Sequence, residues 1–291
     1  MRSRTIVVTA SDEKFFPLAS ELLSSIEAAA PTRSFDVGVL DLGLSPQSRV
    51  IVARRAAHVV TPQWDYPLTM FRDAPANIAQ NITARAHLPR HFPGYDTYMW
   101  IDADAWVQRL EGIELYISAA EQFGFTVTPE CDRSYAEFYG SMSVLDYRLG
   151  AYRLCFNDDL AMKLALFPTI NAGVFAARRD APHWQRWSEV LGELLKIKRE
   201  IFFLADQNAL NAIIRAENLP AAFLPATCNW MCNRALPRCS EDGTMLLESN
   251  PPFVPLAVVH MTANSKELRP ALLDIAGTKH VRSLRYSHGT P

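Results

Sequence analysis

Hydrophobic and polar positions follow two alternating periods along the first sixty residues. Residues 5–10 (TIVVTA) are β-branched and apolar, which predicts a buried strand, and apolar residues at helical spacing follow over 17–29. The same pair recurs as a strand at 34–40 and a helix at 46–56, before a short strand at 59–60. This alternation predicts a parallel sheet of Rossmann type.

The rhythm changes after residue 60. Residues 61–76 contain three prolines and three aromatic residues, which predicts an ordered loop or lid. Residues 130–160 are expected to be irregular, and 225–256 to be loop. No repeat or linker divides the chain, so we expect one compact α/β domain. The other predicted elements are helices at 77–88, 182–198 and 205–215, and strands at 98–102, 125–128, 169–177 and 257–260.

Composition narrows the class of protein. The 291 residues are 49% hydrophobic and carry a net charge of −2, which suits a globular protein and gives no basic face for nucleic acid. No apolar run is long enough to span a bilayer, and the stretch 6–10 is too short for a signal-peptide core, so we expect a cytoplasmic protein. The basic tail, 279–288, would suit peripheral contact with the inner membrane face, but a short disordered tail is the preferred interpretation.

The five cysteines form no disulfide framework, since their number is odd and their spacing irregular. Cys228, Cys232 and Cys239 match no paired zinc motif and lack an obvious fourth ligand. We therefore interpret the cysteines as reduced structural thiols.

Asp102 and Asp104 give the strongest chemical signal, because they lie at the end of the predicted strand 98–102 (YMWID). Residues two apart in a strand share a face, and ligands of open α/β sheets bind at this end of the strands. Two adjacent carboxylates repel each other unless a cation lies between them, and Mg²⁺ or Mn²⁺ would suit their oxygens and bridge a diphosphate. The alternatives are a solvated pair of turn aspartates or the nucleophile of a phosphatase. In the latter class, however, the motif usually ends the first strand.

Seven short motifs extend this signal from Val7 to Lys266. In order they are Thr9-Ala-Ser-Asp12, Thr83-Ala-Arg85-Ala-His-Leu-Pro, Asp102-Ala-Asp104, Ile170-Asn171-Ala-Gly173-Val, Asp206-Gln207-Asn208-Ala-Leu-Asn211, Cys228-Asn229-Trp230-Met and Val259-His260…Lys266. The set resembles glycosyltransferase family 8, retaining enzymes of the GT-A fold. The resemblance implies a mixed central sheet, with a Rossmann-like nucleotide-sugar half (about 1–105), a catalytic and acceptor half (about 106–270) and a tail (271–291).

The same resemblance implies a UDP-sugar donor and a Mn²⁺ or Mg²⁺ ion. His260 would be the third metal ligand beside Asp102 and Asp104, and Lys266 would offset charge on the departing diphosphate. Arg85 would meet the diphosphate or brace the two aspartates. The uridine pocket would be lined by Thr9, Ala10 and Asp12, and the donor-binding set would also include Ala103, Asn171 and Ala172.

Two residues of the motif that begins at Asp206 are implied to act at the donor sugar. Asp206 would bind sugar hydroxyls, and the carbonyl dipole of Gln207 would stabilise an oxocarbenium-like species near the anomeric carbon. Asn171 would hydrogen-bond a sugar hydroxyl, with Gly173 permitting close approach. Plainer structural alternatives are a helix cap for Asp12 and Asp206, a solvated charge for Arg85 and Lys266, and a satisfied core histidine for His260.

The sequence departs from the family at two places. The loop between His260 and Lys266 lacks the usual glycine, no Pro-Trp pair follows Lys266, and Asn208 replaces the family's second Asp. We expect hexose transfer from a UDP-sugar to an acceptor hydroxyl, with retention, in bacterial-type cell-surface glycan or glycolipid synthesis. A non-catalytic nucleotide-sugar-binding protein is the main alternative, and a phosphatase using the Asp102 motif is the other.

Overall fold

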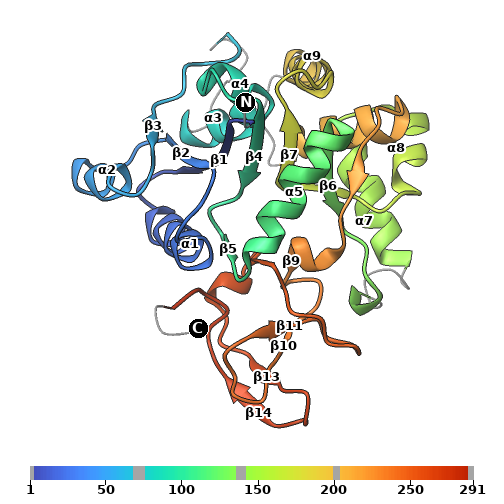
Figure 1. The fold of residues 1–291 in the computed structure, drawn as a ribbon. Helices are drawn as coiled ribbons and strands as arrows, with labels where there is room; N and C mark the ends of the chain where they lie inside the picture. Colours follow the sequence, from blue (N-terminus) through green and yellow to red (C-terminus); the bar gives the residue numbers. More distant parts are fainter. Residues whose placement is uncertain (1–2, 68–75, 136–141, 199–203, 288–291) are drawn as a thin grey trace.

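A seven-stranded sheet forms the centre of the computed structural model, which describes residues 3–67, 76–135, 142–198 and 204–287 (Figure 1). The strand order is β3–β2–β1–β4–β7–β6–β8. Only β7 runs antiparallel to its two neighbours, so the expected mixed sheet is confirmed. The strands are β1 (Thr5–Ser11), β2 (Asp36–Asp41), β3 (His58–Val60), β4 (Thr97–Ile101), β6 (Phe125–Pro129), β7 (Ile170–Arg178) and β8 (Ala222–Phe223).

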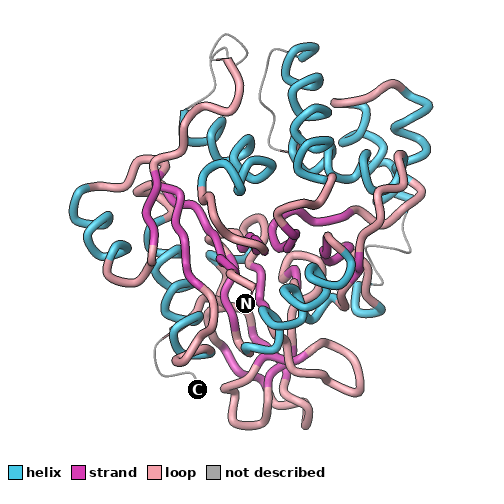
Figure 2. Tube along the Cα trace, turned by 45° about the horizontal axis from the view of Figure 1, so that its top comes forward, coloured by secondary structure: helices cyan, strands magenta, loops and turns pink. Residues whose placement is uncertain are grey.

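Helices cover both faces of this sheet, and Figure 2 shows the strands lying between them. Alternate strand residues enter opposite cores: Ile6 and Trp100 belong to one, Val7 and Met99 to the other. Burial on both faces explains why the central strands are continuous apolar runs. The first core is closed by α3 (Ala76–Ala84), α4 (Leu88–His91), α9 (His183–Lys198) and α10 (Ala205–Asn211), the second by α1 (Phe16–Ala29), α2 (Pro46–Ala53) and α5 (Leu110–Phe123).

The C-terminal segment builds a smaller lobe below the sheet, drawn orange to red in Figure 1. Its three-stranded sheet has the order β5 (Ala105–Val107), β12 (Val258–His260), β9 (Trp230–Met231). Because β5 continues directly from the turn after β4, this pairing ties the lobe to the central sheet. Two hairpins complete the lobe: β10 (Arg238–Cys239) with β11 (Leu246–Leu247), and β13 (Ala271–Leu273) with β14 (Lys279–Val281).

Two predicted irregular regions contain regular structure. Within 130–160 the chain forms α7 (Met142–Arg153) and α8 (Asp158–Ala165), and the side chain of Asn157 caps α8 by accepting a hydrogen bond from the Leu160 amide. Within 225–256 the chain forms β9, β10 and β11. The predicted lid at 61–76 falls partly outside the described residues.

The tail was predicted to be disordered, and this was wrong for its described residues. Leu284 is fully buried, and its carbonyl oxygen accepts a hydrogen bond from the indole of Trp106 (2.9 Å). Arg285 forms an ion pair with Glu21, and His280 lies 3.0 Å from a carboxylate oxygen of Asp274. Packing and pairing of this kind offset the entropy cost of ordering a short polar segment.

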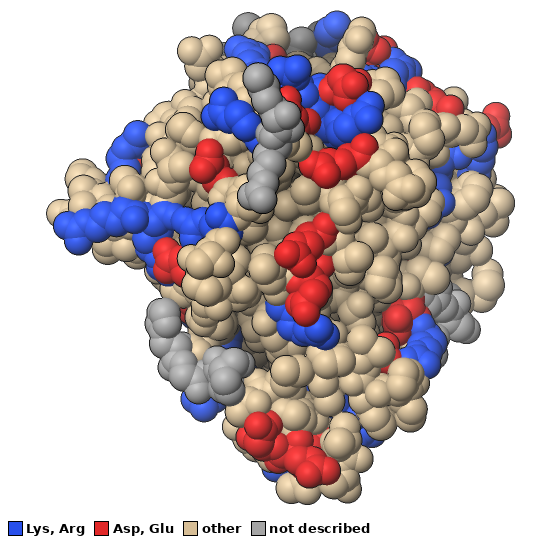
Figure 3. Space-filling view, viewed as in Figure 1, with Lys and Arg blue, Asp and Glu red and all other residues tan. Residues whose placement is uncertain are grey.

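The surface carries charges of both signs. Figure 3 shows acidic and basic side chains interspersed over one face, in keeping with the net charge of −2. Within the described ranges, every helix is too short or too polar to cross a bilayer.

Candidate active site

A cavity of about 450 Å³ lies at the carboxyl ends of β1 and β4, where open α/β sheets bind ligands. Most of the predicted site residues line it, whereas Thr9 and Ala172 are buried within their strands and do not. The predicted residues that line it are Ala10, Asp12, Arg85, Asp102, Ala103, Asp104, Asn171, Asp206, Gln207, His260 and Lys266.

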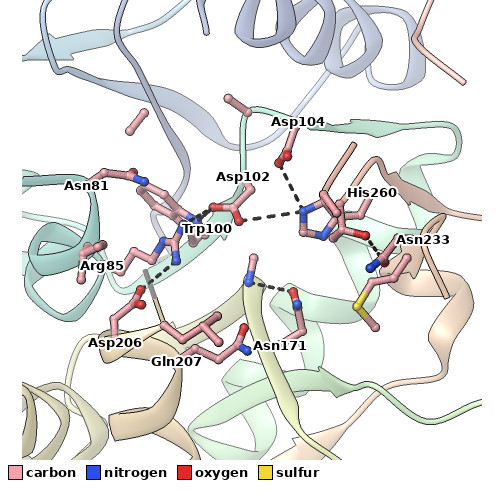
Figure 4. A pocket seen from close by; sticks show the side chains of 18 of the residues that line it. Asn81, Arg85, Trp100, Asp102, Asp104, Asn171, Asp206, Gln207, Asn233 and His260 are labelled. Carbon is pink, nitrogen blue, oxygen red and sulfur yellow. Dashed lines mark hydrogen bonds and ion pairs between the residues drawn. The ribbon is translucent and has the colours of Figure 1, made fainter. Parts of the chain in front are cut away.

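Asp102, Asp104 and His260 converge on one point of this cavity (Figure 4). The imidazole Nε2 lies 3.3 Å from Oδ1 of Asp104 and 3.9 Å from Oδ2 of Asp102. One ligand atom from each residue lies within 4.8 Å of the other two, and no second such group of His, Cys, Asp and Glu occurs in the described part of the chain. Two carboxylates and an imidazole form a donor set that suits Mn²⁺.

The sequence predicted that Asp102 and Asp104 share one face of a strand, and this explanation of their convergence was wrong. Strand β4 ends at Ile101, and Asp102 to Asp104 form the turn into β5, so strand alternation does not align the two carboxylates. The turn is closed by the Ala105 amide, which donates to the Asp102 carbonyl oxygen (3.0 Å). His260 lies opposite Ala105 because β12 pairs with β5. The histidine is therefore brought to the aspartates by strand pairing.

Gly173 of β7 leaves the space in which the three side chains meet. Its carbonyl oxygen accepts a hydrogen bond from the Asp102 amide (2.8 Å). A Cβ atom at this position would lie 2.4 Å from Cε1 of His260 and 2.8 Å from Oδ2 of Asp102. Such contacts are far inside van der Waals distance, so a side chain at Gly173 would fill the cradle that suits a metal ion.

Arg85 braces the site from the turn that follows α3. Its guanidinium donates to Oδ1 of Asp102 (2.6 Å) and to Oδ2 of Asp206 (2.7 Å), and it lies over the Trp100 ring. Burial lowers the pKa of Arg85, but the two carboxylates outweigh this effect and raise it. Arg85 is therefore a largely buried link between the turn after β4 and α10, and the solvated alternative is wrong.

Lys266 reaches the metal motif directly. Its Nζ lies 2.9 Å from Oδ2 of Asp104. Burial raises the pKa of Asp104, but hydrogen bonds and charge from His260 and Lys266 outweigh burial and lower it. Ala263, in the loop where the family usually has glycine, adopts a φ of 55°. This left-handed conformation favours glycine, so the loop keeps a glycine-like backbone at a cost in strain.

Asp12 has a structural role as well as a place in the cavity. Its Oδ1 accepts from the Phe15 amide (2.8 Å), and its Oδ2 accepts from the Asn77 side chain (2.6 Å). The first bond closes the turn before α1, and the second joins this turn to α3. The N-cap of α1 is Phe15, so Asp12 does not cap the helix. Ala10, Asp12, Phe15 and Asn77 all line the cavity.

The three polar residues at the start of α10 face different partners. The N-cap of α10 is Leu204, so Asp206 does not cap the helix. Gln207 accepts a hydrogen bond from the Ala172 amide through Oε1 (3.1 Å). The Asn208 amide donates to the Ala151 carbonyl oxygen (3.0 Å) and thereby ties α10 to α7. A carboxylate could not donate there, so an amide side chain suits this position.

Several lining residues were not singled out from the sequence. Asn81 precedes Arg85 by four residues, and this helical spacing was a usable signal. Five further polar or aromatic lining residues lie in segments predicted to be irregular or loop, where no period points to a face. They are Glu130, Tyr147, Arg148, Asn233 and Arg234.

The cysteines agree with the interpretation as reduced thiols. All five are free, and Cys228, Cys232 and Cys239 are buried. Burial raises the pKa of the Cys232 thiol to about 12, which keeps it protonated and unreactive.

The mixed sheet, its parallel N-terminal half and the aspartate turn after β4 define a GT-A glycosyltransferase fold, and solved structures of this class match it. The galactosyltransferase LgtC, in complex with donor and acceptor sugar analogues, is 18% identical with a TM-score of 0.56, over 89% of this chain and 88% of its own. The bifunctional glycosyltransferase WbbM, in its apo form, is 16% identical with a TM-score of 0.55, over 90% of this chain and 46% of its own. The glycosyltransferase GlyE of Streptococcus pneumoniae is 14% identical with a TM-score of 0.52, over 91% of this chain and 56% of its own. No protein-family model and no curated protein sequence matches the chain.

Proposed function

We propose that this protein is a metal-dependent glycosyltransferase that transfers a hexose from a UDP-sugar to an acceptor hydroxyl. The observation that carries the proposal is the convergence of Asp102, Asp104 and His260 inside a cavity of a GT-A fold. Retention of configuration is added from the resemblance to glycosyltransferase family 8. A Mn²⁺ or Mg²⁺ ion held by these three residues would neutralise charge on the departing diphosphate.

The chain's own residues supply the remaining charge and orientation. Lys266, close to Asp104, adds a point charge where the diphosphate departs, and Arg85 holds the carboxylate of Asp102 in place. Oδ1 of Asp206 is buried and has no hydrogen-bond partner among the described residues, which supports its role as acceptor for a donor-sugar hydroxyl. Gln207 would turn its remaining carbonyl lone pair toward the anomeric carbon, and the departing phosphate would accept the acceptor's proton.

We assign parts of the cavity lining to the two substrates. Ala10, Asp12 and Asn77 line the part that we assign to the nucleoside, and Asp12 and Asn77 are hydrogen-bonded to each other. Tyr147 of α7 and Arg234, whose guanidinium lies over the Tyr147 ring, line the part that we assign to a glycan or glycolipid acceptor. We retain a cytoplasmic location as part of the proposal. The described tail residues His280 and Arg285 are engaged within the fold, so membrane contact has no support from them.

Two observations disfavour the alternatives. In the phosphatase class the aspartate motif usually ends the first strand, whereas Asp102 follows β4, the fourth strand along this chain. The phosphatase alternative is therefore disfavoured. The non-catalytic alternative rested on the altered loop after His260, but that loop still delivers Lys266 to Asp104.

A screen of nucleotide sugars with Mn²⁺ present tests the proposal. We expect one UDP-sugar to be turned over, and Asp104→Asn to abolish Mn²⁺-dependent turnover while thermal unfolding shows an intact fold. Asp180→Asn, which removes an exposed carboxylate paired with Arg178, is the matched control. Binding of UDP without turnover of any donor would instead indicate a non-catalytic binding protein, and release of phosphate from an aryl phosphate would indicate a phosphatase.

A further inference from the structure

A chain of buried hydrogen bonds leads from the backbone of β7 to the histidine of the site. The Gly173 amide donates to Oδ1 of Asn171 (2.9 Å), and the Asn229 side-chain amide donates to the same oxygen (3.1 Å). Oδ1 of Asn229 lies 2.9 Å from Nδ1 of His260. Asn229 is fully buried, and Asn171 and His260 are nearly so, which means that water cannot readily replace these partners.

The direction of every bond in this chain follows from its first donor. A backbone amide can only donate, so the Asn171 atom facing Gly173 is its carbonyl oxygen. That oxygen can only accept, so Asn229 turns its amino group toward Asn171 and its carbonyl oxygen toward His260. The proton between Asn229 and His260 must then reside on Nδ1 of the imidazole.

The other end of Asn171 leads to the same orientation independently. Its amino group donates to Oε1 of Glu130 (3.3 Å), and Oε2 of Glu130 accepts from Arg234 (2.8 Å). A carboxylate that is held by an arginine accepts hydrogen bonds, which again places the amino group of Asn171 on this side. Both lone pairs of the Asn171 carbonyl oxygen are thus used inside the protein. The expected hydrogen bond from Asn171 to a sugar hydroxyl would therefore have to use the second hydrogen of its amino group.

We propose that Asn229, held in register by Asn171, is a positioning residue that fixes His260 as a metal ligand. With the proton on Nδ1, the lone pair of Nε2 points at the space shared with Asp102 and Asp104. A histidine that ligates a metal commonly donates its other N–H to a partner that sets its tautomer and ring plane, and loss of such a partner weakens metal affinity about 10–100-fold. This inference rests on the metal site of the proposed function.

Measurement of Mn²⁺ affinity by electron paramagnetic resonance of the free ion tests the inference. Asn229→Leu removes the acceptor for Nδ1, so we expect the dissociation constant for Mn²⁺ to rise about 10–100-fold. Asn208→Leu is the matched control, because Asn208 is also a buried amide but bonds α7. In a His260→Ala background, Asn229→Leu should change the dissociation constant less than about twofold, since its effect runs through the imidazole.

A second measurement uses the unsubstituted protein and does not depend on a variant that folds. Imidazole nitrogen–proton correlation spectra with Mg²⁺ present should place the His260 proton on Nδ1, with the signal assigned by its loss in His260→Ala. A proton on Nε2, or unchanged Mn²⁺ affinity in folded Asn229→Leu, would overturn the inference and leave the proposed function standing. Failure of the unsubstituted protein to bind Mn²⁺ would overturn both.

Discussion

Replacement of Gly173 by alanine tests how closely the backbone of β7 defines the site. The new Cβ would lie 2.4 Å from Cε1 of His260, where ordinary contacts are 3.4–4 Å, so the strand or the imidazole must move by about 1 Å. Neither can move freely, because Asn229 holds His260 and the Asp102 amide is bonded to the Gly173 carbonyl oxygen. Overpacking of this kind costs about 1–3 kcal/mol of stability.

The effect on the metal should exceed the effect on the fold. Disturbing the positioning of metal ligands costs about 10–100-fold in metal affinity, so we expect the dissociation constant for Mn²⁺ to rise by about that factor in Gly173→Ala. The assay combines Mn²⁺ titration with chemical denaturation. Gly150→Ala in α7 is the control, because its Cβ would meet open space and alanine favours the helix. If Gly173→Ala binds Mn²⁺ as tightly as the unsubstituted protein, the metal site does not depend on the absence of a side chain at Gly173.

Four other outcomes can be measured. Lys266→Ala should lower the turnover number more than it weakens donor binding, because the diphosphate gains charge in the transition state; steady-state kinetics showing only a raised KM would contradict this. Ala263→Gly should raise the free energy of unfolding by up to about 1 kcal/mol, since strain at a φ of 55° is relieved; a loss in chemical denaturation would count against it. Asn208→Asp should lower the free energy of unfolding by about 2–3 kcal/mol, because a buried acceptor would face the Ala151 carbonyl oxygen, and unchanged stability would show that Asp fits there. Burial lowers the pKa of His183 from 6.5 to about 4. Between these two values the unfolded chain binds a proton at His183 and the folded chain does not, so the free energy of unfolding should fall by about 3 kcal/mol from pH 7 to pH 4. His183→Phe should remove that part of the acid dependence.

The strands of the central sheet could be predicted because each is a short apolar run between polar segments. The predicted strands at 98–102 and 169–177 correspond to β4 and β7 within one residue at each end. Burial on both faces makes every position apolar, and this signal needs no knowledge of the partners. Helix α5 was not predicted, although Ile113, Tyr116 and Ala120 have helical spacing, so its signal was present and overlooked.

Helix α7 could not be predicted in the same way. It is only partly apolar on its buried side, where Arg148 lies beside Val144 and Tyr152. A helix that lines a ligand cavity presents polar groups toward the protein, which breaks the apolar period. Asn157 before two acidic residues was a local signal for the start of α8, since it is a favoured N-cap.

The candidate site also contains a part that could be predicted from the sequence and a part that could not. Asp102, Asp104 and His260 could be predicted to meet because motifs in a recognisable order carry long-range information. The contact between Asn229 and His260 could not be predicted from the sequence, because it depends on the pairing of β12 with both β5 and β9. No local pattern around a buried asparagine reveals which side chain it will face once distant strands are joined.

The position of β7 between β4 and β6 has a consequence for how the chain is made. Strand β4 is complete at Ile101, but its neighbour β7 begins only at Ile170, about seventy residues later. During synthesis on the ribosome, the edge of β4 that later pairs with β7 therefore stays unpaired for a time. Because β4 is also apolar on both faces, it could pair with strands of other nascent chains. A fragment that ends near residue 105 would keep that exposed edge permanently. It should aggregate rather than fold as a separate unit.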